Sequence, residues 1–156
     1  MEITRQCEWA FGLLEYRQMF ALSDDEQALS ILDFPGGMSS FNAEMTALGH
    51  TVISADEAYD LPFSDMRSRV GGQIDELAAH LVAHADHIAD ETHTTTQILK
   101  RATQAASCFT EDYQDGVAVG RYVSASLPRL PFSDYQFNLA LCSHWLFSES
   151  PDSFFQ

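Results

Sequence analysis

The clearest pattern of apolar and polar residues lies in the first third of the chain. It predicts a strand, a glycine turn, a helix and a second strand. The short apolar run at residues 29–32 is typical of a buried strand. Gly36-Gly37 then form a turn where a ligand can approach the backbone closely, because glycine lacks a Cβ atom. A short helix follows, and residues 51–55 are expected to form the second strand, which ends at Asp56.

Further helices and two more strands are predicted on either side of this unit. Apolar residues recurring every three or four positions predict helices at about residues 8–22, 64–93 and 95–107, and a short turn or helix at 109–113. The two further strands are predicted at residues 121–125 and 137–142. The segment between these strands is expected to be a loop, because its two prolines exclude regular structure.

Composition restricts the classes of partner that this chain is expected to bind. Its 156 residues suit one domain, residues 1–156, with a core of its own. The 8 Lys and Arg residues against 23 Asp and Glu residues give a formal net charge of −15. So acidic a chain repels phosphate backbones and anionic lipids at long range. We therefore expect neither nucleic acid nor a membrane as a partner.

No targeting feature is visible in the sequence. No apolar run approaches the roughly 18 residues of a membrane helix. The first residues lack the basic segment and apolar stretch of a secretory signal. Cys7, Cys108 and Cys142 are far apart and form no paired spacing, which favours reduced thiols. The expected location is the cytoplasm.

Two aspartates end the first pair of predicted strands. Asp33 follows the first strand and Asp56 follows the second. In open parallel sheets, ligands bind outside the carboxyl ends of the strands, and an acidic residue about 20 positions after a glycine turn is where Rossmann-type folds hold ribose hydroxyls. Asp33 can accept hydrogen bonds from a ligand ammonium group, and Asp56 from two ribose hydroxyls. The alternative is that both carboxylates cap helices or loops.

A longer set of residues resembles a known family. The set reads Asp33-x-x-Gly36-Gly37-x-Ser39 with Asp56, then Arg121-Tyr122-Val123, then Leu127-Pro-x-Leu-Pro-Phe132-x-Asp134-x-x-Phe137-x-Leu-x-Leu-Cys-Ser-His144. It is similar to the class I S-adenosylmethionine-dependent methyltransferases over about residues 12–147. The closing stretch is the more specific part, because many members have a Leu-Pro-Phe loop before the fourth strand.

The resemblance implies a fold and a set of cofactor-binding residues. The fold is α/β and Rossmann-like: four parallel strands in the order 3-2-1-4, right-handed crossovers, helices on both faces, and a helical insertion at about residues 64–113. The implied cofactor residues are Asp33, Phe34, Gly36 and Gly37 at the methionine part, Asp56 at the ribose, Glu57, Ala58, Ser126 and Leu127 at the adenine, and Ser143 with His144 on the methyl-transfer side.

Several features depart from the family pattern. Pro35 occupies a place usually taken by glycine and removes one backbone donor. Ser126 stands where an acid or amide often contacts the adenine amine, and Asn138 stands where aspartate is usual. We expect these differences to lower cofactor affinity without abolishing it. The family's sheet also has three further strands, whereas about a dozen residues follow the fourth strand here. The chain is therefore expected to be either a natural half-fold or a fragment.

Other reactive side chains have simpler explanations. His80, His84, His87 and Glu91 share one helical face, a geometry that can hold Zn²⁺ or Ni²⁺. We favour a polar flank of an amphipathic helix, because no further ligand group is signalled, and we expect no metal. Cys142 is expected to be a buried, inert thiol.

No catalytic residue is assigned. In methyl transfer from a sulfonium, the reactivity belongs to the cofactor, and the protein supplies positioning and exclusion of water. His144 is the candidate general base near the methyl group, with helix capping as its competing role. Tyr16 and Tyr113 lie on helices that can approach the cofactor, and helix packing is their default role.

The function expected from the sequence is S-adenosylmethionine-dependent methyl transfer to a small-molecule acceptor. The alternative is a non-catalytic methyltransferase-like remnant that acts in assembly or regulation. A nicotinamide-cofactor domain is a third interpretation, weakened because the turn lacks the full Gly-x-Gly-x-x-Gly spacing. An unpaired fourth strand further predicts a homodimer through about residues 137–147, because Leu139, Leu141 and Trp145-Leu146-Phe147 would lack covering helices.

Overall fold

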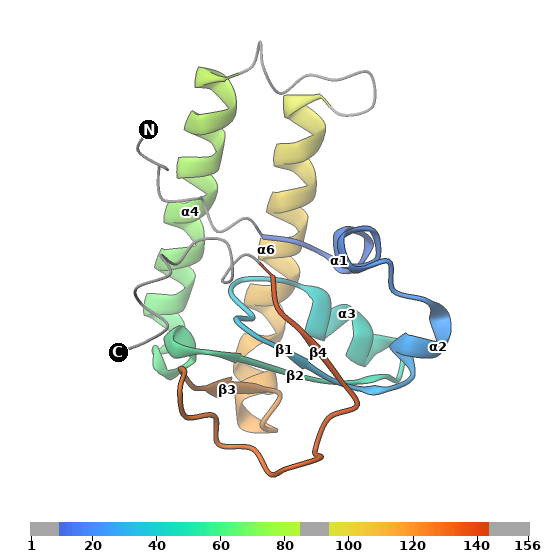
Figure 1. Cartoon of the computed structure of the whole chain (residues 1–156). Helices are drawn as coiled ribbons and strands as arrows, with labels where there is room; N and C mark the ends of the chain where they lie inside the picture. Colours follow the sequence, from blue (N-terminus) through green and yellow to red (C-terminus); the bar gives the residue numbers. More distant parts are fainter. Residues whose placement is uncertain (1–9, 85–93, 144–156) are drawn as a thin grey trace.

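A computed structural model describes residues 10–84 and 94–143 of the chain (Figure 1). The elements are α1 (Leu13–Phe20), α2 (Asp24–Gln27), β1 (Ser30–Asp33), α3 (Phe41–Ala47), β2 (Thr51–Asp56), the 3₁₀ helix η1 (Glu57–Asp60), α4 (Phe63–Ala83), α6 (Thr95–Ala118), β3 (Tyr122–Ser124) and β4 (Leu139–Leu141). Within these described ranges, no helix is both long and apolar enough to cross a membrane.

The four strands form one parallel sheet in the order β3-β2-β1-β4, which confirms the predicted α/β, Rossmann-like fold. β1 pairs with β2 on one side and with β4 on the other, so Asp33 lies between Ser54 and Leu141 in the register. From β1 the chain adds β2 and then β3 on one side, and it then crosses back to place β4 on the other side of β1. The strand order therefore reverses between β1 and β4. Such a switch point is where open α/β sheets bind ligands, outside the carboxyl ends of the strands.

The helices that precede β3 gather on one side of the sheet. In Figure 1, α1, α3, α4 and α6 lie on that side, whereas the connection from β3 to β4 runs along the opposite side. Right-handed crossovers explain this placement, because the step from β3 back to β4 reverses direction and therefore crosses on the other face. Among the described residues, that crossover is an irregular segment with a local bridge between Ser126 and Arg129 and no helix. The prediction of helices on both faces of the sheet is therefore wrong for the described part of the chain.

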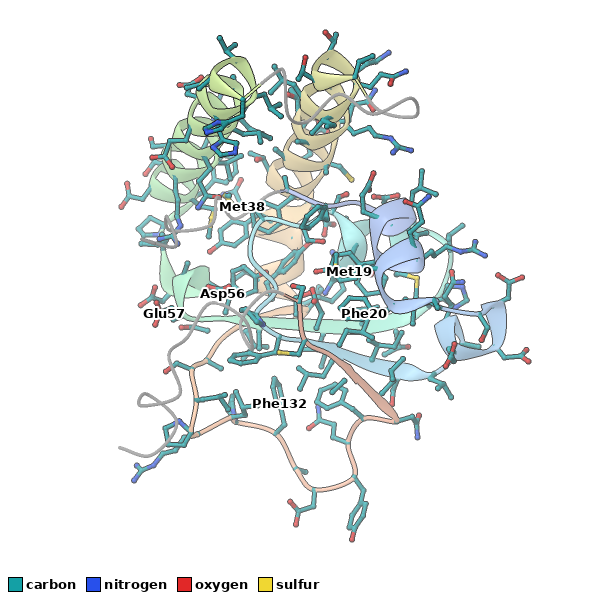
Figure 2. The ribbon with its side chains drawn as sticks, turned by 45° about the horizontal axis from the view of Figure 1, so that its top comes forward. Met19, Phe20, Met38, Asp56, Glu57 and Phe132 are labelled. Carbon is teal, nitrogen blue, oxygen red and sulfur yellow. The ribbon has the colours of Figure 1, made fainter. Side chains whose placement is uncertain are left out.

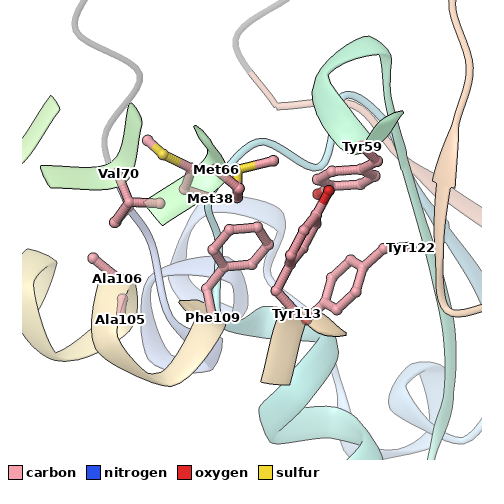
Figure 3. Packing of buried hydrophobic residues seen from close by; sticks show 10 residues of the cluster. Met38, Tyr59, Met66, Val70, Ala105, Ala106, Phe109, Tyr113 and Tyr122 are labelled. Atoms are coloured by element: carbon pink, nitrogen blue, oxygen red, sulfur yellow. The ribbon is translucent and has the colours of Figure 1, made fainter. Parts of the chain in front are cut away.

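The core has two main parts on the helical side. One joins α1 and α3 to the sheet and includes Tyr16, Ile31, Phe41, Val52 and Leu141. The other joins the base of α4 and α6 to β3 and η1. Figure 3 shows Tyr59, Phe109, Tyr113 and Tyr122 packed together there. A smaller apolar cluster, centred on Leu77, Leu81 and Ala102, holds α4 and α6 together farther from the sheet.

Three expected helices differ from those observed. The helix predicted at 64–93 corresponds to α4, which ends at Ala83. The last helix was predicted at 95–107, but α6 continues to Ala118 because Phe109, Tyr113 and Gly116 extend its buried stripe. Gly116 is buried beneath the Tyr122 ring. The N-terminal helix was predicted at 8–22, but α1 begins only at Leu13, where Gly12 and Glu15 form a capping arrangement.

The prediction that Leu139 and Leu141 lack covering helices is wrong. Leu141 is 4% exposed, and Leu139 packs on the same apolar cluster as Tyr16 and Phe41. Because the two leucines are two residues apart in the strand, both lie on the sheet face that α1 and α3 cover, and these helices shield them. The Trp145-Leu146-Phe147 part of that prediction lies outside the described residues.

Candidate functional site

Asp33, at the carboxyl end of β1, is the centre of a buried polar cluster. Its side chain is fully buried. The Tyr16 hydroxyl donates to Asp33 Oδ1 over 3.0 Å, and the Ser54 hydroxyl donates to Oδ2 over 3.0 Å. Tyr16 comes from α1 and Ser54 from β2, so two elements far apart in the sequence converge on this carboxyl group.

Burial makes Asp33 a weaker acid than an ordinary aspartate. Desolvation raises the pKa of Asp33 to about 7, against the lowering effect of the hydrogen bonds from Ser54 and Tyr16, and the nearby Asp56 charge raises it further. A carboxyl group of this pKa changes between its neutral and ionised forms near neutral pH. A cation placed beside it would favour the ionised form.

Asp56, at the end of β2, holds the glycine turn in place. Its Oδ2 accepts from the Gly37 backbone N–H over 3.0 Å, and its Oδ1 accepts from the Ala58 N–H over 2.9 Å. Figure 2 shows Asp56 within the fold beside the strand ends, with Glu57 at the edge of the molecule. Each carboxylate oxygen has two lone pairs and can accept more than one hydrogen bond.

The two glycines of the turn have different roles. A Cβ atom on Gly36 would collide with the Tyr59 hydroxyl and the Ser54 side chain, so this glycine permits close packing within the protein. Gly37 has a φ of +53°, which favours glycine, and a Cβ there would meet nothing within 4 Å. Among the described residues, the Gly37 side of the turn therefore leaves room for a ligand that the Gly36 side does not.

The backbone donors of this turn are engaged within the protein. The Phe34 N–H donates to the Leu141 carbonyl over 3.0 Å, and the Gly36 N–H donates to the Ala55 carbonyl over 2.9 Å. Pro35 has no N–H, and the Gly37 N–H donates to Asp56. Dinucleotide-binding folds instead offer such amides to a pyrophosphate. This turn therefore suits a cation better than a phosphate.

The remaining predicted cofactor residues differ in how far they are exposed to solvent. Ser143 is 8% exposed, and Ser143 and Ser39 are close enough to the Tyr16 hydroxyl to lower its pKa, against the larger raising effect of burial. Glu57 is exposed and Ala58 partly buried. Ser126 and Leu127 are exposed on the β3–β4 connection, which starts beside Asp56, since the Ala125 N–H donates to the Asp56 carbonyl over 3.2 Å. The structure thus joins Asp33, Gly37, Asp56 and Ser143 in one region and leaves Ser126 and Leu127 at its rim.

Sequence reasoning missed two members of this cluster. Ser54 was not singled out, although it lies two residues before Asp56 and therefore on the same sheet face, a signal that strand alternation supplies. Tyr59 donates from its hydroxyl to the Gly37 carbonyl over 2.7 Å. It lies on η1, a short 3₁₀ helix between the predicted second strand and the next predicted helix, so no periodic signal pointed to it.

A separate hollow of about 310 Å³ lies between α1, α3 and α6. Its lining includes the carboxylates of Glu15 and Glu44. Glu15 accepts from the Gly12 N–H and Glu44 accepts from the Leu13 N–H, at 2.9 and 3.1 Å. Both side chains therefore cap the start of α1, and that role accounts for their position.

The histidines on α4 are placed near its end. The rings of His80 and His84 stack with centroids 4.3 Å apart, and His84 is exposed. Across residues 10–84 and 94–143, no group of three or more His, Cys, Asp or Glu side chains is arranged to hold a metal ion. His87, Glu91 and His144 lie outside the described residues.

Comparisons with known proteins add one relative. No protein-family model matches the chain, and no solved structure matches it. An uncharacterized protein of Methanocaldococcus jannaschii is 29% identical over 134 residues, which cover 85% of this chain and 60% of that protein. The chain thus spans about 60% of the length of this curated relative, whose description assigns no activity.

Proposed function

We propose that the carboxyl ends of β1 and β2 bind S-adenosylmethionine and that the chain serves methyl transfer to a small-molecule acceptor. The observation that carries this proposal is the pair of buried carboxylates, Asp33 and Asp56, on either side of a glycine turn. The cofactor carries a sulfonium and an ammonium group, and carboxylates attract both. The sequence resemblance to class I methyltransferases supports the same cofactor.

The residues present fit such a cofactor. Asp33 supplies negative charge beneath the turn, and Asp56 offers acceptor positions to ribose hydroxyls. Gly37 leaves space on its open side. When bound, the cofactor supplies an electrophilic methyl group, and the protein's part is to orient it and exclude water. Because the amides at residues 34–37 are engaged, the anionic pyrophosphate of a nicotinamide dinucleotide is disfavoured.

One observation favours the alternative, a non-catalytic remnant. Both oxygens of Asp33 and both oxygens of Asp56 already accept hydrogen bonds within the protein. Tyr59 also packs closely over Gly36. Carboxylates satisfied in this way stabilise the strand ends without a ligand. The two functions are separated by whether the cofactor binds at all.

Isothermal titration calorimetry with S-adenosylmethionine tests the proposal. Asp56→Ala should weaken binding by about 1.5–3 kcal/mol, the usual contribution of hydrogen bonds to a charged group. Asp60→Ala is the matched control, because Asp60 lies on the same η1 segment but is exposed. This control should bind like the parent protein.

Three outcomes distinguish the interpretations. Binding of S-adenosylmethionine and its demethylated product, without binding of NADH, supports the methyltransferase proposal. No binding of either compound by the folded parent protein favours the remnant. If Asp56→Ala remains folded and binds as tightly as Asp60→Ala, the assignment of Asp56 to the ribose is wrong.

A homodimer through the outer side of β4 stays a prediction. Within the described residues, β4 pairs only with β1, and an unpaired strand edge is a template for a strand of a second copy. Ala140 is exposed on this strand, whereas Leu141 is buried under the helices. Light scattering at micromolar concentration should show a dimer that Ala140→Lys disrupts and Ser133→Lys, on the β3–β4 connection, does not. A monomeric parent protein would exclude this interface.

A further inference from the structure

Tyr16 connects helix α1 to the carboxyl group beneath the glycine turn. Its hydroxyl donates to Asp33 Oδ1 over 3.0 Å, and its side chain is 1% exposed. The ring stacks on Phe41 of α3 with centroids 4.2 Å apart and planes at 10°. Two packed helices therefore fix the position of this hydroxyl, so the direction of the hydrogen bond to Asp33 is set by the fold.

We propose that Tyr16 is a positioning residue that holds Asp33 for a cationic ligand, through a hydrogen bond that strengthens when Asp33 ionises. This inference rests on the proposed binding of S-adenosylmethionine. When the cation binds, the Asp33 carboxyl group gives up its proton to the solvent. The hydrogen bond from Tyr16 then has a charged acceptor and becomes stronger.

The groups around Asp33 are consistent with an ionisation that depends on a bound cation. From α1 it faces the Tyr16 hydroxyl, from β2 the Ser54 hydroxyl and the Asp56 carboxylate, and from η1 the Tyr59 hydroxyl, whose pKa the charge on Asp33 helps to raise. These groups are either neutral donors or a second negative charge. A cation brought by the ligand therefore changes the ionisation of Asp33 strongly, because it supplies the charge that these neighbours lack.

Removing the Tyr16 hydroxyl should weaken binding in a pH-dependent way. Without this donor the pKa of Asp33 rises, so a larger fraction of Asp33 must lose a proton before the cation binds. We expect Tyr16→Phe to bind S-adenosylmethionine about tenfold more weakly than the parent protein at pH 6 and almost equally at pH 8.5. A purely structural role would weaken binding by the same factor at both pH values.

Tyr113→Phe is the matched control. Its hydroxyl also donates over 3.0 Å and its side chain is 2% exposed, but the acceptor is the Leu61 carbonyl and not a carboxylate. The ratio of its affinity to that of the parent should not change with pH. Ser54→Ala removes the other donor to Asp33 and should shift the pH profile in the same direction as Tyr16→Phe.

The experiment is calorimetric titration with S-adenosylmethionine at pH 6 and 8.5, together with carbon-13 NMR titration of the Asp33 carboxyl group in the ligand-free proteins. The expected NMR midpoint is near 7 in the parent protein, higher in Tyr16→Phe and Ser54→Ala, and unchanged in Tyr113→Phe. If the parent protein binds S-adenosylmethionine, but the ratio of its affinity to that of Tyr16→Phe is the same at both pH values, this inference is wrong. The proposed function would then stand. No binding by the parent protein would overturn the proposed function and the coupling with it, whatever the NMR midpoints.

Discussion

The hairpin of α4 and α6 and the carboxyl ends of β1 and β2 are stabilised in opposite ways. The hairpin is held by apolar side chains such as Leu77, Leu81 and Ala102, all nearly fully buried. The strand ends bury Asp33 and Asp56 instead, and hydrogen bonds to their oxygens offset part of the cost of removing them from water. Apolar burial stabilises the fold, whereas a buried acid of raised pKa is typical of functional sites.

The two regions meet at η1. Tyr59 belongs to the apolar cluster at the base of the hairpin, and its hydroxyl donates to the Gly37 carbonyl. The hairpin therefore supports the glycine turn through Tyr59 and through Met38, which directly follows the turn and belongs to the same cluster. We accordingly expect substitutions far along the hairpin to change stability alone, and substitutions at the strand ends to change binding and its pH dependence.

The largest expected effect is in the hairpin. Leu77→Ala leaves a cavity between α4 and α6 and should lower the free energy of unfolding by about 2–5 kcal/mol. Val82→Ala, on the same helix but 81% exposed, should change it by less than about 0.5 kcal/mol. Urea denaturation measures both values. If the folded Leu77→Ala protein bound S-adenosylmethionine much more weakly, the proposed independence of the two regions would be wrong.

Alanine substitutions at two glycines should change the stability in opposite directions. Gly116→Ala places a methyl group against the Tyr122 ring and should destabilise the protein by about 1–3 kcal/mol. Gly72→Ala, at an open position of α4, should stabilise it by about 0.5–1 kcal/mol. Thermal unfolding of both variants checks these signs. Equal melting temperatures would contradict the packing of α6 against β3.

The pH dependence of stability should be sensitive to Asp33. Its folded pKa of about 7 lies above the ordinary 3.8, so its contribution is fully present below about pH 4 and is lost as the pH rises to 7. Over that range the free energy of unfolding should fall as the pH rises, because the unfolded state releases the proton that the folded state keeps. Asp33→Asn should remove this slope.

The control for that prediction is Asp60→Asn, because Asp60 is an exposed aspartate. Urea denaturation from pH 4.5 to 7.5 compares the two variants with the parent protein. A slope that persists in Asp33→Asn would show that another group causes the pH dependence.

The smallest effect is expected at the start of α6. Thr94 caps this helix: its hydroxyl accepts from the Gln97 N–H over 3.2 Å, and Gln97 Oε1 accepts from the Thr94 N–H over 3.0 Å. Thr94→Ala should cost about 1 kcal/mol. Thr96→Ala, an exposed position in the first turn, should cost less than about 0.5 kcal/mol. Chemical denaturation separates them, and equal stabilities would exclude the capping role.

Much of the fold was predictable because its periodic signals are local. The apolar run before Asp33 and the strand before Asp56 placed β1 and β2 within one residue of their observed ends. The end of α6 was missed because residues 109–113 were interpreted as a separate short turn or helix, whereas Phe109 and Tyr113 continue the buried stripe of α6. Farther along the helix, the missing side chain of Gly116 lets Tyr122 pack against it.

The site was only partly predictable. Strand order places Asp33 and Asp56 at neighbouring ends, so their proximity followed from the sequence. The hydrogen bond from Tyr16 did not, because it depends on how α1 packs against Phe41 in three dimensions. Likewise, the resemblance predicted that Gly36 lines the cofactor, whereas the role of Gly36 in packing against Tyr59 is visible only in the structure.

Backbone amide NMR during titration with S-adenosylmethionine tests the central claim most directly. If the strand ends bind the cofactor, the largest shifts should occur at Gly37, Ala58 and Ser143, and the amides of Leu81 and Ala102 in the hairpin should not move. Shifts centred on the hairpin, or no shifts at saturating cofactor, would contradict the assignment of this site.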